Sequence, residues 1–344
     1  MQDVAVIVVN YRTPDLTLRC VESLAAARAS FERFRVVVVD GGSADGSAER
    51  IAQVVAAHGW EDWVTPLPLA INGGFAFANN RAIALLVADG APPAGIALIN
   101  PDARVRPGAL ERMAALLDER PQAGAVGARL IHEDGRPQSS AFRFPSIRGE
   151  FCRGAGTGAI DRLLRVPPVS IDSDVAVEVP WVTGAAVLFR TAALAEAGLF
   201  DEGFFLYFEE TELMRRLRAQ GWTVWHEPAA LVVHEGGAAT QIRDPETGLH
   251  LAKPMPAYWY QSRRRFLTLG RGRAYGFGAG FAWLLGRGVW RLRQAMAPRE
   301  RGGPRREVRD TLAHGLWPTR TDATARFKRL GEPASERPAW MDAP

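Results

Sequence analysis

The chain has 344 residues, of which 47% are hydrophobic and 23% are charged. This balance excludes a mainly disordered chain and suits one large α/β domain with an appendage, or two modest domains. The two cysteines, Cys20 and Cys152, are too few for a disulfide framework or a cysteine-based zinc site, and they fit a reducing cytoplasm.

The start of the chain and its charge distribution add two expectations. The first ten residues carry Asp3 and lack a basic region, so we expect a β-strand rather than a signal peptide, and no stretch has the roughly 18 consecutive apolar residues of a membrane-spanning helix. Residues 1–252 hold 23 basic and 31 acidic residues, whereas residues 253–344 hold 19 basic and 7 acidic ones. Such a basic tail is typical of contact with an anionic surface, although a simply solvated tail is the commoner case.

The first half of the chain predicts an open α/β sheet. Apolar runs at residues 4–9, 36–39 and 96–99 are typical of strands buried on both faces. Helical spacing at residues 16–29, 48–57 and 110–117 alternates with these strands, and a further strand is expected at 124–130. Ligands of such sheets bind beyond the carboxyl ends of the strands, which is where Asn10, Asp40 and Asn100 stand.

The second half of the chain is less regular. Prolines and glycines in residues 132–178 predict long loops. A strand at 179–189 broken by Gly184, a helix at 208–220 and a short strand at 231–233 complete a domain that we expect to span residues 1–252. Residues 253–297 are aromatic and basic and predict a helical extension, and residues 298–344 predict a weakly ordered tail.

Two strand ends carry candidate metal ligands. Asp102 closes the segment Asn100-Pro101-Asp102, and a carboxylate there suits Mg²⁺ or Mn²⁺, although this tripeptide is also a common turn. His234 follows the predicted strand at 231–233 and gains weight as a ligand only if it meets Asp102. The glycines of the loop at residues 40–47 allow close approach to a ligand, and the loop lacks the lysine of a Walker motif.

A candidate general base lies where an apolar run meets three carboxylates, Glu209, Glu210 and Glu212. Apolar surroundings raise the pKa of a glutamate, which favours a general base near neutral pH. Acidic residues in a first helical turn also complement the helix dipole, so a purely structural role is the plainer interpretation of these residues alone.

Taken in order, these motifs resemble family 2 glycosyltransferases of the GT-A fold, especially the rhamnosyltransferase-like branch, over about two thirds of the chain. The matching segments are 8–11, 40–47, 72–80, 100–102, 181–185, 200–202, 205–210, 215–222 and His234. The resemblance implies a mainly parallel central sheet flanked by helices, with a basic helical extension at the C-terminus. It also implies an inverting transfer of a sugar, with a deoxyhexose such as rhamnose as the best candidate. The donor would be a dTDP- or UDP-linked sugar, and the acceptor a hydroxyl of a cell-surface glycan or lipid-linked saccharide.

The resemblance also implies residue roles. Glu210 would be the catalytic base, with Glu209 as its alternative, and Asp102 and His234 would bind Mg²⁺ or Mn²⁺. The donor would be bound by Asn10, Tyr11, Asp40, Gly42, Asn72, Gly74, Phe75, Asn79 and Asn100, and the acceptor side would be formed by Trp181, Gly184 and Ala185. The chain departs from the family pattern where Asn100 and Glu210 each replace a usual aspartate and where Gly41 replaces a frequent asparagine.

Two other functions stay open at this point. A nucleotidyltransferase would share the strand-end carboxylates, and Arg12 keeps this alternative open, although the loop after the first strand lacks the usual glycines. A catalytically inactive homologue that binds a nucleotide or glycan is the other alternative, supported by the departures at Asn100 and Glu210. No nucleic-acid partner is expected, because no recognition motif accompanies the basic tail.

The extension carries a further expectation. Its aromatic and aliphatic residues alternate with arginines, a composition typical of a helix that lies in a membrane interface. The residues are Phe277, Phe281, Trp283, Leu284, Leu285 and Trp290, with Arg287, Arg291 and Arg293 between them. Packing on the catalytic domain and a homodimer contact are the alternatives. We therefore expect a cytoplasmic protein with peripheral contact at the inner face of the plasma membrane.

Overall fold

The computed structural model of the protein describes residues 1–236, 254–296 and 306–342. Its main sheet contains β1 (Asp3–Asn10), β2 (Arg33–Asp40), β3 (Val64–Pro68), β4 (Gly95–Ile99), β5 (Ala103–Val105), β6 (Ala123–Ile131), β7 (Pro137–Gln138), β9 (Val177–Glu178), β11 (Ala186–Arg190) and β12 (Thr223–His234). Two further strands, β8 (Ala141–Phe142) and β10 (Trp181–Val182), pair with each other in a small second sheet.

The main sheet has the order β3-β2-β1-β4-β11-β6-β12-β5. Strands β1 to β4 pair in parallel, β11 runs antiparallel between β4 and β6, and β6 pairs in parallel with β12. The register of β1 and β2 places Asn10 opposite Asp40, so their carboxyl ends are level at one edge of the sheet. The expected α/β class is confirmed, with a mixed sheet.

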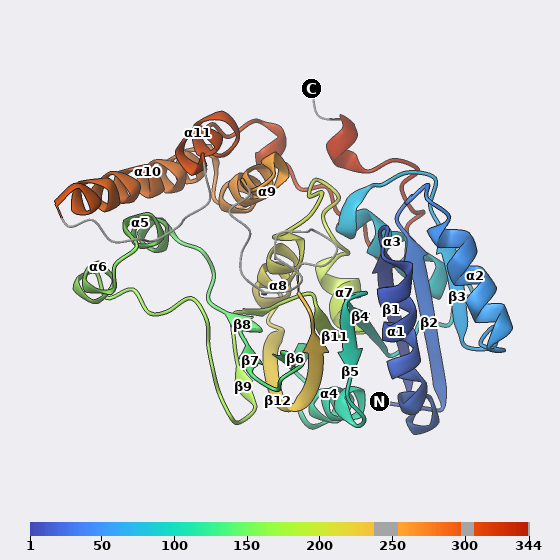
Figure 1. The fold of residues 1–344 in the computed structure, drawn as a ribbon. Helices are drawn as coiled ribbons and strands as arrows, with labels where there is room; N and C mark the ends of the chain where they lie inside the picture. The colour runs from blue at the N-terminus through green and yellow to red at the C-terminus, as the bar shows by residue number, and fades with distance from the viewer. Residues whose placement is uncertain (237–253, 297–305, 343–344) are drawn as a thin grey trace.

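Helices cover both faces of this sheet (Figure 1). They are α1 (Pro14–Leu24), the 3-10 helix η1 (Ala25–Ser30), α2 (Ser47–Ala57), α3 (Gly74–Val87), α4 (Ala109–Glu119), α7 (Thr191–Ala197) and α8 (Glu209–Ala219). Side chains of β1 alternate between the faces: Val6 belongs to the hydrophobic cluster that includes residues of α1, α2 and α4, whereas Ile7 belongs to the one that includes residues of α3, α7 and α8. Two hydrophobic layers therefore hold the sheet, which leaves its carboxyl edge for polar loops.

A helical arm extends from the domain, at upper left in Figure 1. It contains α5 (Ile147–Ala155), α6 (Gly158–Leu163), α9 (Ala257–Thr268), α10 (Arg273–Met296), α11 (Glu307–Asp310) and the π-helical turn η2 (Thr311–Gly315). Helices α5 and α10 cross so closely that a Cβ on Gly286 would lie 2.1 Å from the carbonyl oxygen of Phe151. The helices α5 and α6 replace the long loops expected at residues 132–178, because α5 is stabilised by a partner helix far away in the sequence. Within the described ranges, no helix is both long enough and apolar enough to cross a bilayer.

The C-terminal residues also differ from expectation. Instead of a weakly ordered tail, residues 306–342 pack on the protein through α11, η2, η3 (Thr321–Ala323) and η4 (Ala339–Asp342). Backbone hydrogen bonds fix this segment, for example from Leu199 N–H to the Lys328 carbonyl (2.8 Å). The segment boundaries predicted at 252/253 and 297/298 lie outside the described residues.

Candidate active site

The loops after β1 and β2 are joined by a hydrogen-bond network between Asn10 and Asp40. The Asn10 amide donates to Asp40 Oδ1 (2.6 Å), and its oxygen accepts from the Thr17 hydroxyl (2.9 Å). The Ser43 hydroxyl and backbone N–H also donate to the Asp40 carboxylate, at 2.7 and 3.0 Å. Asn10 is fully buried, and its hydrogen bond to Asp40 joins the two loops. Asp40 also accepts hydrogen bonds from Ser43 in its own loop. Donor contacts of either residue stay a prediction.

A third loop, which precedes α3, lies against the loop after β2 at Gly42. This glycine has φ +70°, and a Cβ there would lie 2.6 Å from the Ile71 carbonyl carbon, so the loop at residues 40–47 touches the backbone before Asn72. A Cβ on Gly41 would lie 3.9 Å from the ring of Tyr11 in the loop after β1. The predicted donor residues of three loops therefore gather at one edge of the sheet.

The start of α3 contacts the segment that leads into α8. Gly74 has φ +85°, and a Cβ there would lie 2.0 Å from the Phe205 carbonyl oxygen. The Phe75 backbone N–H donates to that same oxygen (2.9 Å), and Asn72 Oδ1 accepts from Gly74 N–H (3.1 Å). Asn79 is buried and donates to the Phe75 carbonyl (2.8 Å). The predicted donor loop is thus in direct contact with the chain before Glu209.

The carboxyl groups of Glu209 and Glu210 lie at the N-terminus of α8, behind a strained turn. Tyr207 and Phe208 have φ values of +72° and +69°, a left-handed conformation that costs on the order of 1–3 kcal/mol for each such residue. The Oε2 atom of each glutamate is buried without a hydrogen-bond partner. Burial raises the pKa of Glu210, and burial together with the charge of Glu210 raises the pKa of Glu209 well above the usual carboxyl value.

Glu210 lies next to residues predicted for both substrates. A Cβ on Gly184 would lie 3.7 Å from Glu210 Cβ and 3.6 Å from Phe75 Cε1. The structure therefore brings together one predicted base, one predicted acceptor-side residue and one predicted donor residue. This arrangement can abstract a proton from a hydroxyl that enters beside a bound donor.

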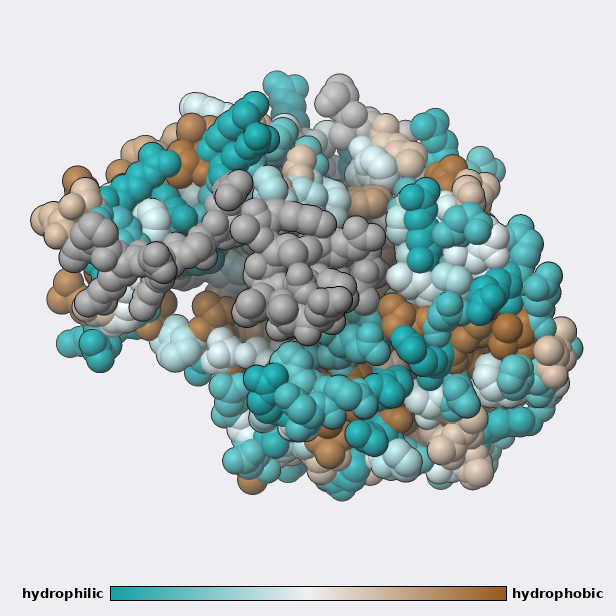
Figure 2. Space-filling model, in the orientation of Figure 1, coloured by the Kyte–Doolittle hydropathy of each residue, from teal (hydrophilic) through white to brown (hydrophobic). Residues whose placement is uncertain are grey.

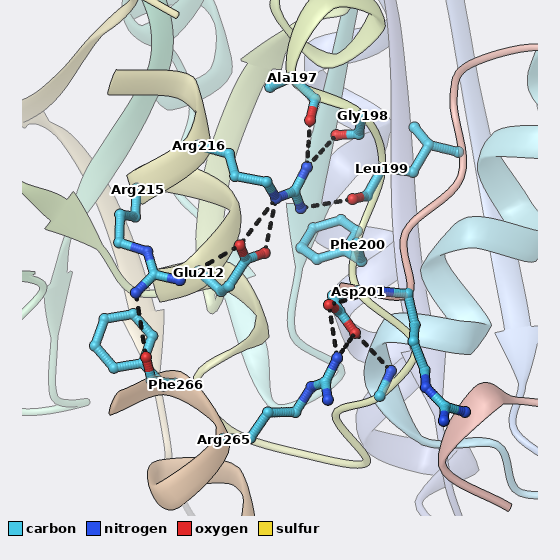
Figure 3. A network of polar contacts seen from close by, with 12 residues as sticks. Ala197, Gly198, Leu199, Phe200, Asp201, Glu212, Arg215, Arg216, Arg265 and Phe266 are labelled. Carbon is cyan, nitrogen blue, oxygen red and sulfur yellow. Dashed lines mark hydrogen bonds and ion pairs between the residues drawn. The ribbon is translucent and has the colours of Figure 1, made fainter. Parts of the chain in front are cut away.

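Glu212 has a different role from its two neighbours. Its carboxylate accepts two hydrogen bonds from Arg216 Nε, at 2.8 and 3.0 Å (Figure 3). The same guanidinium donates to the carbonyl groups of Ala197, Gly198 and Leu199. Glu212 therefore ties α8 to the chain after α7, and its charge is neutralised by an arginine.

Asp102 and His234 meet because β5 pairs antiparallel with β12, which places His234 opposite Ala103. His234 Nε2 lies 3.3 Å from Asp102 Oδ1, and both side chains are largely buried. Gln138 completes the arrangement: its Nε2 donates to the His234 carbonyl, so its Oε1 accepts from His234 Nδ1 at 3.2 Å. With this proton on Nδ1, the neutral form of His234 would present the lone pair of Nε2 to Asp102. Gln138 was missed because it lies in the segment expected to be loop.

This pair fits a divalent cation. His234 Nε2 is buried without a hydrogen-bond partner, and a separation of 3.3 Å suits two ligands of one ion at about 2.1 Å each. No group of three or more histidine, cysteine, aspartate or glutamate side chains suited to a metal occurs in the described part of the chain. Two protein ligands suit an ion such as Mg²⁺, whose other ligands are phosphate oxygens and water.

Two more of the predicted residues form hydrogen bonds within the protein. Asn100 N–H donates to the Ala185 carbonyl (2.9 Å), which holds the turn that carries Asp102. The Trp181 indole donates to the Arg143 carbonyl (3.1 Å) and stacks on Phe142 with ring centroids 4.6 Å apart. Ligand contacts of these side chains stay predictions.

Residues 5–193 match the family model described as glycosyl transferase family 2, which is more than half of the chain. The chain belongs to glycosyl transferase family 2. The match covers the loops after β1, β2 and β4 and the start of α3, and it ends before α8.

Two curated relatives are rhamnosyltransferases. The N-acetylglucosaminyl-diphospho-decaprenol L-rhamnosyltransferase of Mycobacterium tuberculosis is 32% identical over 246 residues, which cover 67% of this chain and 75% of the relative. Rhamnosyltransferase WbbL of Escherichia coli is 33% identical over 70 residues, covering 20% of this chain and 26% of the relative. The expected resemblance to the rhamnosyltransferase-like branch is confirmed.

A solved structure supports the fold. The mannosyltransferase PcManGT from Pyrobaculum calidifontis, in complex with GDP-Man and Mn²⁺, superposes with a TM-score of 0.51 at 15% identity, covering 87% of this chain and 77% of that one. At this identity the likeness concerns the fold alone, and it confirms the expected GT-A class of the transferase.

Proposed function

We propose that the protein transfers a deoxyhexose, with rhamnose as the first candidate, from a dTDP- or UDP-linked donor to a hydroxyl of a lipid-linked saccharide. The sugar and the acceptor class follow the name of the Mycobacterium tuberculosis relative. The observation that carries the proposal is the contact of the partly buried Glu210 with Gly184 and, through Gly184, with the ring of Phe75. It places a carboxylate of raised pKa beside the predicted donor loop.

Glu210 acts as the general base in this proposal. Its carboxylate takes the proton of the acceptor hydroxyl while that oxygen forms a bond to the anomeric carbon. The bond from this carbon to the diphosphate breaks, and the nucleoside diphosphate leaves with the electron pair. Attack opposite the leaving group inverts the anomeric centre through a transition state of oxocarbenium character. Glu209, which is the more deeply buried of the two, is the alternative base.

Asp102 and His234 would hold the divalent cation. A bound Mg²⁺ or Mn²⁺ would supply positive charge next to the departing diphosphate. Gln138 keeps the proton of His234 on Nδ1, which leaves Nε2 able to bind a cation. The backbone N–H of Asn100 donates to the Ala185 carbonyl and so helps to hold the turn that carries Asp102.

The test is a transfer assay with the purified protein. The donor is dTDP-rhamnose, compared with UDP-sugars, and the acceptor is a short-chain polyprenyl diphosphate that carries N-acetylglucosamine. We expect a product heavier by one deoxyhexose, formed only with a divalent cation. An inactive homologue would bind the nucleotide without forming product, and a nucleotidyltransferase would release inorganic diphosphate from dTTP and a sugar phosphate. Either result would overturn the proposal.

We also propose that the protein contacts a membrane surface. The outer face of α10 supports this contact. Trp283 is buried against α5, whereas Phe281, Leu285, Leu292 and Met296 are 47, 52, 67 and 78% exposed. These four residues recur at intervals of 4, 7 and 4 and so form one stripe on the opposite side of the helix. The helix therefore packs on the protein with one face and presents apolar side chains with the other.

Arginines lie on another side of α10, where this helix meets α11. A cavity of about 680 Å³ between α10 and α11 is lined by Arg287, Trp290, Arg291, Arg306, Glu307, Val308, Arg309, Leu312 and Ala313. Glu307 pairs with Arg287 at 2.7 Å, which leaves three positive charges in excess. Figure 2 shows apolar and strongly hydrophilic residues intermixed on this arm. An apolar stripe on a helix whose other side carries arginines suits the headgroup region of an anionic bilayer.

Vesicle sedimentation tests the membrane contact. We expect binding to vesicles with one third phosphatidylglycerol and little binding to pure phosphatidylcholine. The double variant Phe281→Ser/Leu285→Ser and the variant Arg291→Gln should reduce binding at least tenfold. The control Val175→Ser, at a residue that is 71% exposed in a loop, should bind like the original protein. Equal sedimentation of all variants would contradict membrane contact by the stripe. A concentration-dependent dimer that the double variant no longer forms would assign the stripe to a contact between two copies of the chain.

A further inference from the structure

The C-terminal segment at residues 319–342, called the strap below, follows the chain that leads to the catalytic glutamates. Glu202 N–H donates to the Arg326 carbonyl (3.1 Å), and Leu199 N–H donates to that of Lys328 (2.8 Å). In the reverse direction, Arg326 N–H donates to Asp201 Oδ2 (3.0 Å). Main-chain N–H groups of both segments donate, so hydrogen bonds join the strap to residues 199–202 in both directions.

A buried ion pair anchors the start of the strap. Arg265 of α9 donates from Nη2 to both oxygens of Asp201, at 2.7 and 2.8 Å, and Asp201 is fully buried (Figure 3). The same guanidinium donates to the carbonyl groups of Thr321 and Thr324. One arginine thus connects α9, the strap and the segment before α8.

Trp340 connects the far end of the strap to both sides of the predicted site. Its indole Nε1–H donates to the Gly73 carbonyl (2.9 Å), and its backbone N–H donates to the Glu202 carbonyl (3.1 Å). Its ring meets the ring of Phe205 edge-on, with centroids 5.2 Å apart. Trp340 therefore contacts Gly73, which precedes Gly74, and Phe205, whose carbonyl oxygen lies against Gly74.

The turn that Trp340 supports is strained and needs such support. Tyr207 and Phe208 are both left-handed, directly before Glu209. Conformations of this kind persist only where the surroundings hold them in place. Helix α9 holds the middle of the turn, through Ser262, which donates to the Leu206 carbonyl (2.9 Å). Trp340 holds its beginning at Phe205.

We propose that Trp340 is a positioning residue that keeps the predicted donor loop at Gly73–Gly74 in register with the glutamates at the start of α8. The inference rests on the proposed function for its effect on catalysis, but the contacts it concerns can be measured without activity. Trp340 was not predicted from the sequence, where its signal is an isolated tryptophan in a Pro-rich segment.

The test compares three variants of the full chain. Trp340→Phe keeps a ring against Phe205 and loses the indole N–H, and Trp340→Ala loses both. Trp225→Phe is the matched control: its half-buried indole donates to the Thr223 hydroxyl (2.9 Å) on β12, away from this turn. The measurements are hydrogen exchange of the Phe75 amide and of residues 203–210, and kcat and KM for the donor.

We expect Trp340→Ala to speed exchange of the Phe75 amide and of residues 203–210 at least tenfold, with exchange in β1 and β2 unchanged. Its kcat should fall at least tenfold, with a smaller change in donor KM, and Trp340→Phe should be intermediate. Exchange that rises equally throughout the protein, or not at all at residues 203–210, would overturn the positioning role. If the original protein transfers no sugar, the proposed function fails while the exchange result still decides the role of Trp340.

Discussion

His234 Nε2 lies 3.3 Å from Asp102 Oδ1, and the antiparallel pairing of β5 with β12 is what joins these two distant residues. Their main chains are also bonded, since Glu235 N–H donates to the Asp102 carbonyl (3.1 Å). Strand register therefore holds this predicted pair of cation ligands in place.

The first prediction concerns the ligands themselves. His234→Ala and Asp102→Asn should abolish the Mn²⁺-dependent part of the rise in Tm that a nucleoside diphosphate produces. The reason is that ligand binding stabilises the native state by about 2.7 kcal/mol at 100 times the Kd. His58→Ala is the control, because His58 is exposed and bonds only its own helix backbone, at Val54. A Mn²⁺-dependent rise that persists in both variants would exclude this pair as the metal site.

The second prediction concerns Gln138. Gln138→Leu removes the acceptor for His234 Nδ1–H, and loss of such an outer partner typically lowers metal affinity by about 10–100-fold. Gln138→Glu restores an acceptor and should recover most of the affinity. Mn²⁺ titration in the presence of dTDP, followed by calorimetry, measures both. Equal affinity of the Leu and Glu variants would contradict a role in orienting His234.

The third prediction separates catalysis from binding. Glu210→Gln should lower kcat by about 10²–10⁴-fold, the range of general-base catalysis, with donor affinity kept within a few-fold. Because burial raises the pKa of Glu210, the rate of the original protein should fall as pH decreases through that raised pKa, where the base becomes protonated. Glu133→Gln, at a carboxylate that is 67% exposed, serves as the control. Full activity of Glu210→Gln would transfer the role to Glu209.

The fourth prediction concerns stability and pH. Burial raises the pKa of Glu209 above its unfolded value, so its neutral form stabilises the fold below the unfolded pKa. This contribution is lost as pH rises through the folded pKa. Glu209→Gln cannot ionise, so its Tm should exceed that of the original protein by more at pH 8 than at pH 5. A difference that does not change with pH would mean that Glu209 is already ionised across this range.

The fifth prediction concerns the anchor of the strap. Asp201→Asn leaves the buried Arg265 without its counter-charge, and removal of one partner of a buried pair costs about 3–5 kcal/mol. Urea unfolding should report this loss. Asp45→Asn, in an exposed loop position, should change stability by less than about 1 kcal/mol. A stability close to the original value in Asp201→Asn would show that the strap is held mainly by its backbone hydrogen bonds.

The sequence pattern predicted those helices and strands whose own spacing of apolar residues stabilises them. The strands at β1, β2 and β4 and the helices α2, α4 and α8 were expected close to where they lie, because their buried faces follow periods of two or of 3.6 residues. The helix α5 and most of β12 were not expected. Helix α5 is covered by α10, and the start of β12 by β6 and β9, so their partners come from distant parts of the chain.

The sequence by itself determined the α/β class, the loops after the strands and the candidate carboxylates, because each depends on residues close together in the chain. The pairing of Asp102 with His234, the burial of Glu209 and Glu210, and the return of Trp340 to Gly73 were decided by the tertiary structure alone. The physical reason is that a ligand separation, a desolvated carboxyl group and a hydrogen bond across the fold depend on strand register and on packing between segments that share no local pattern.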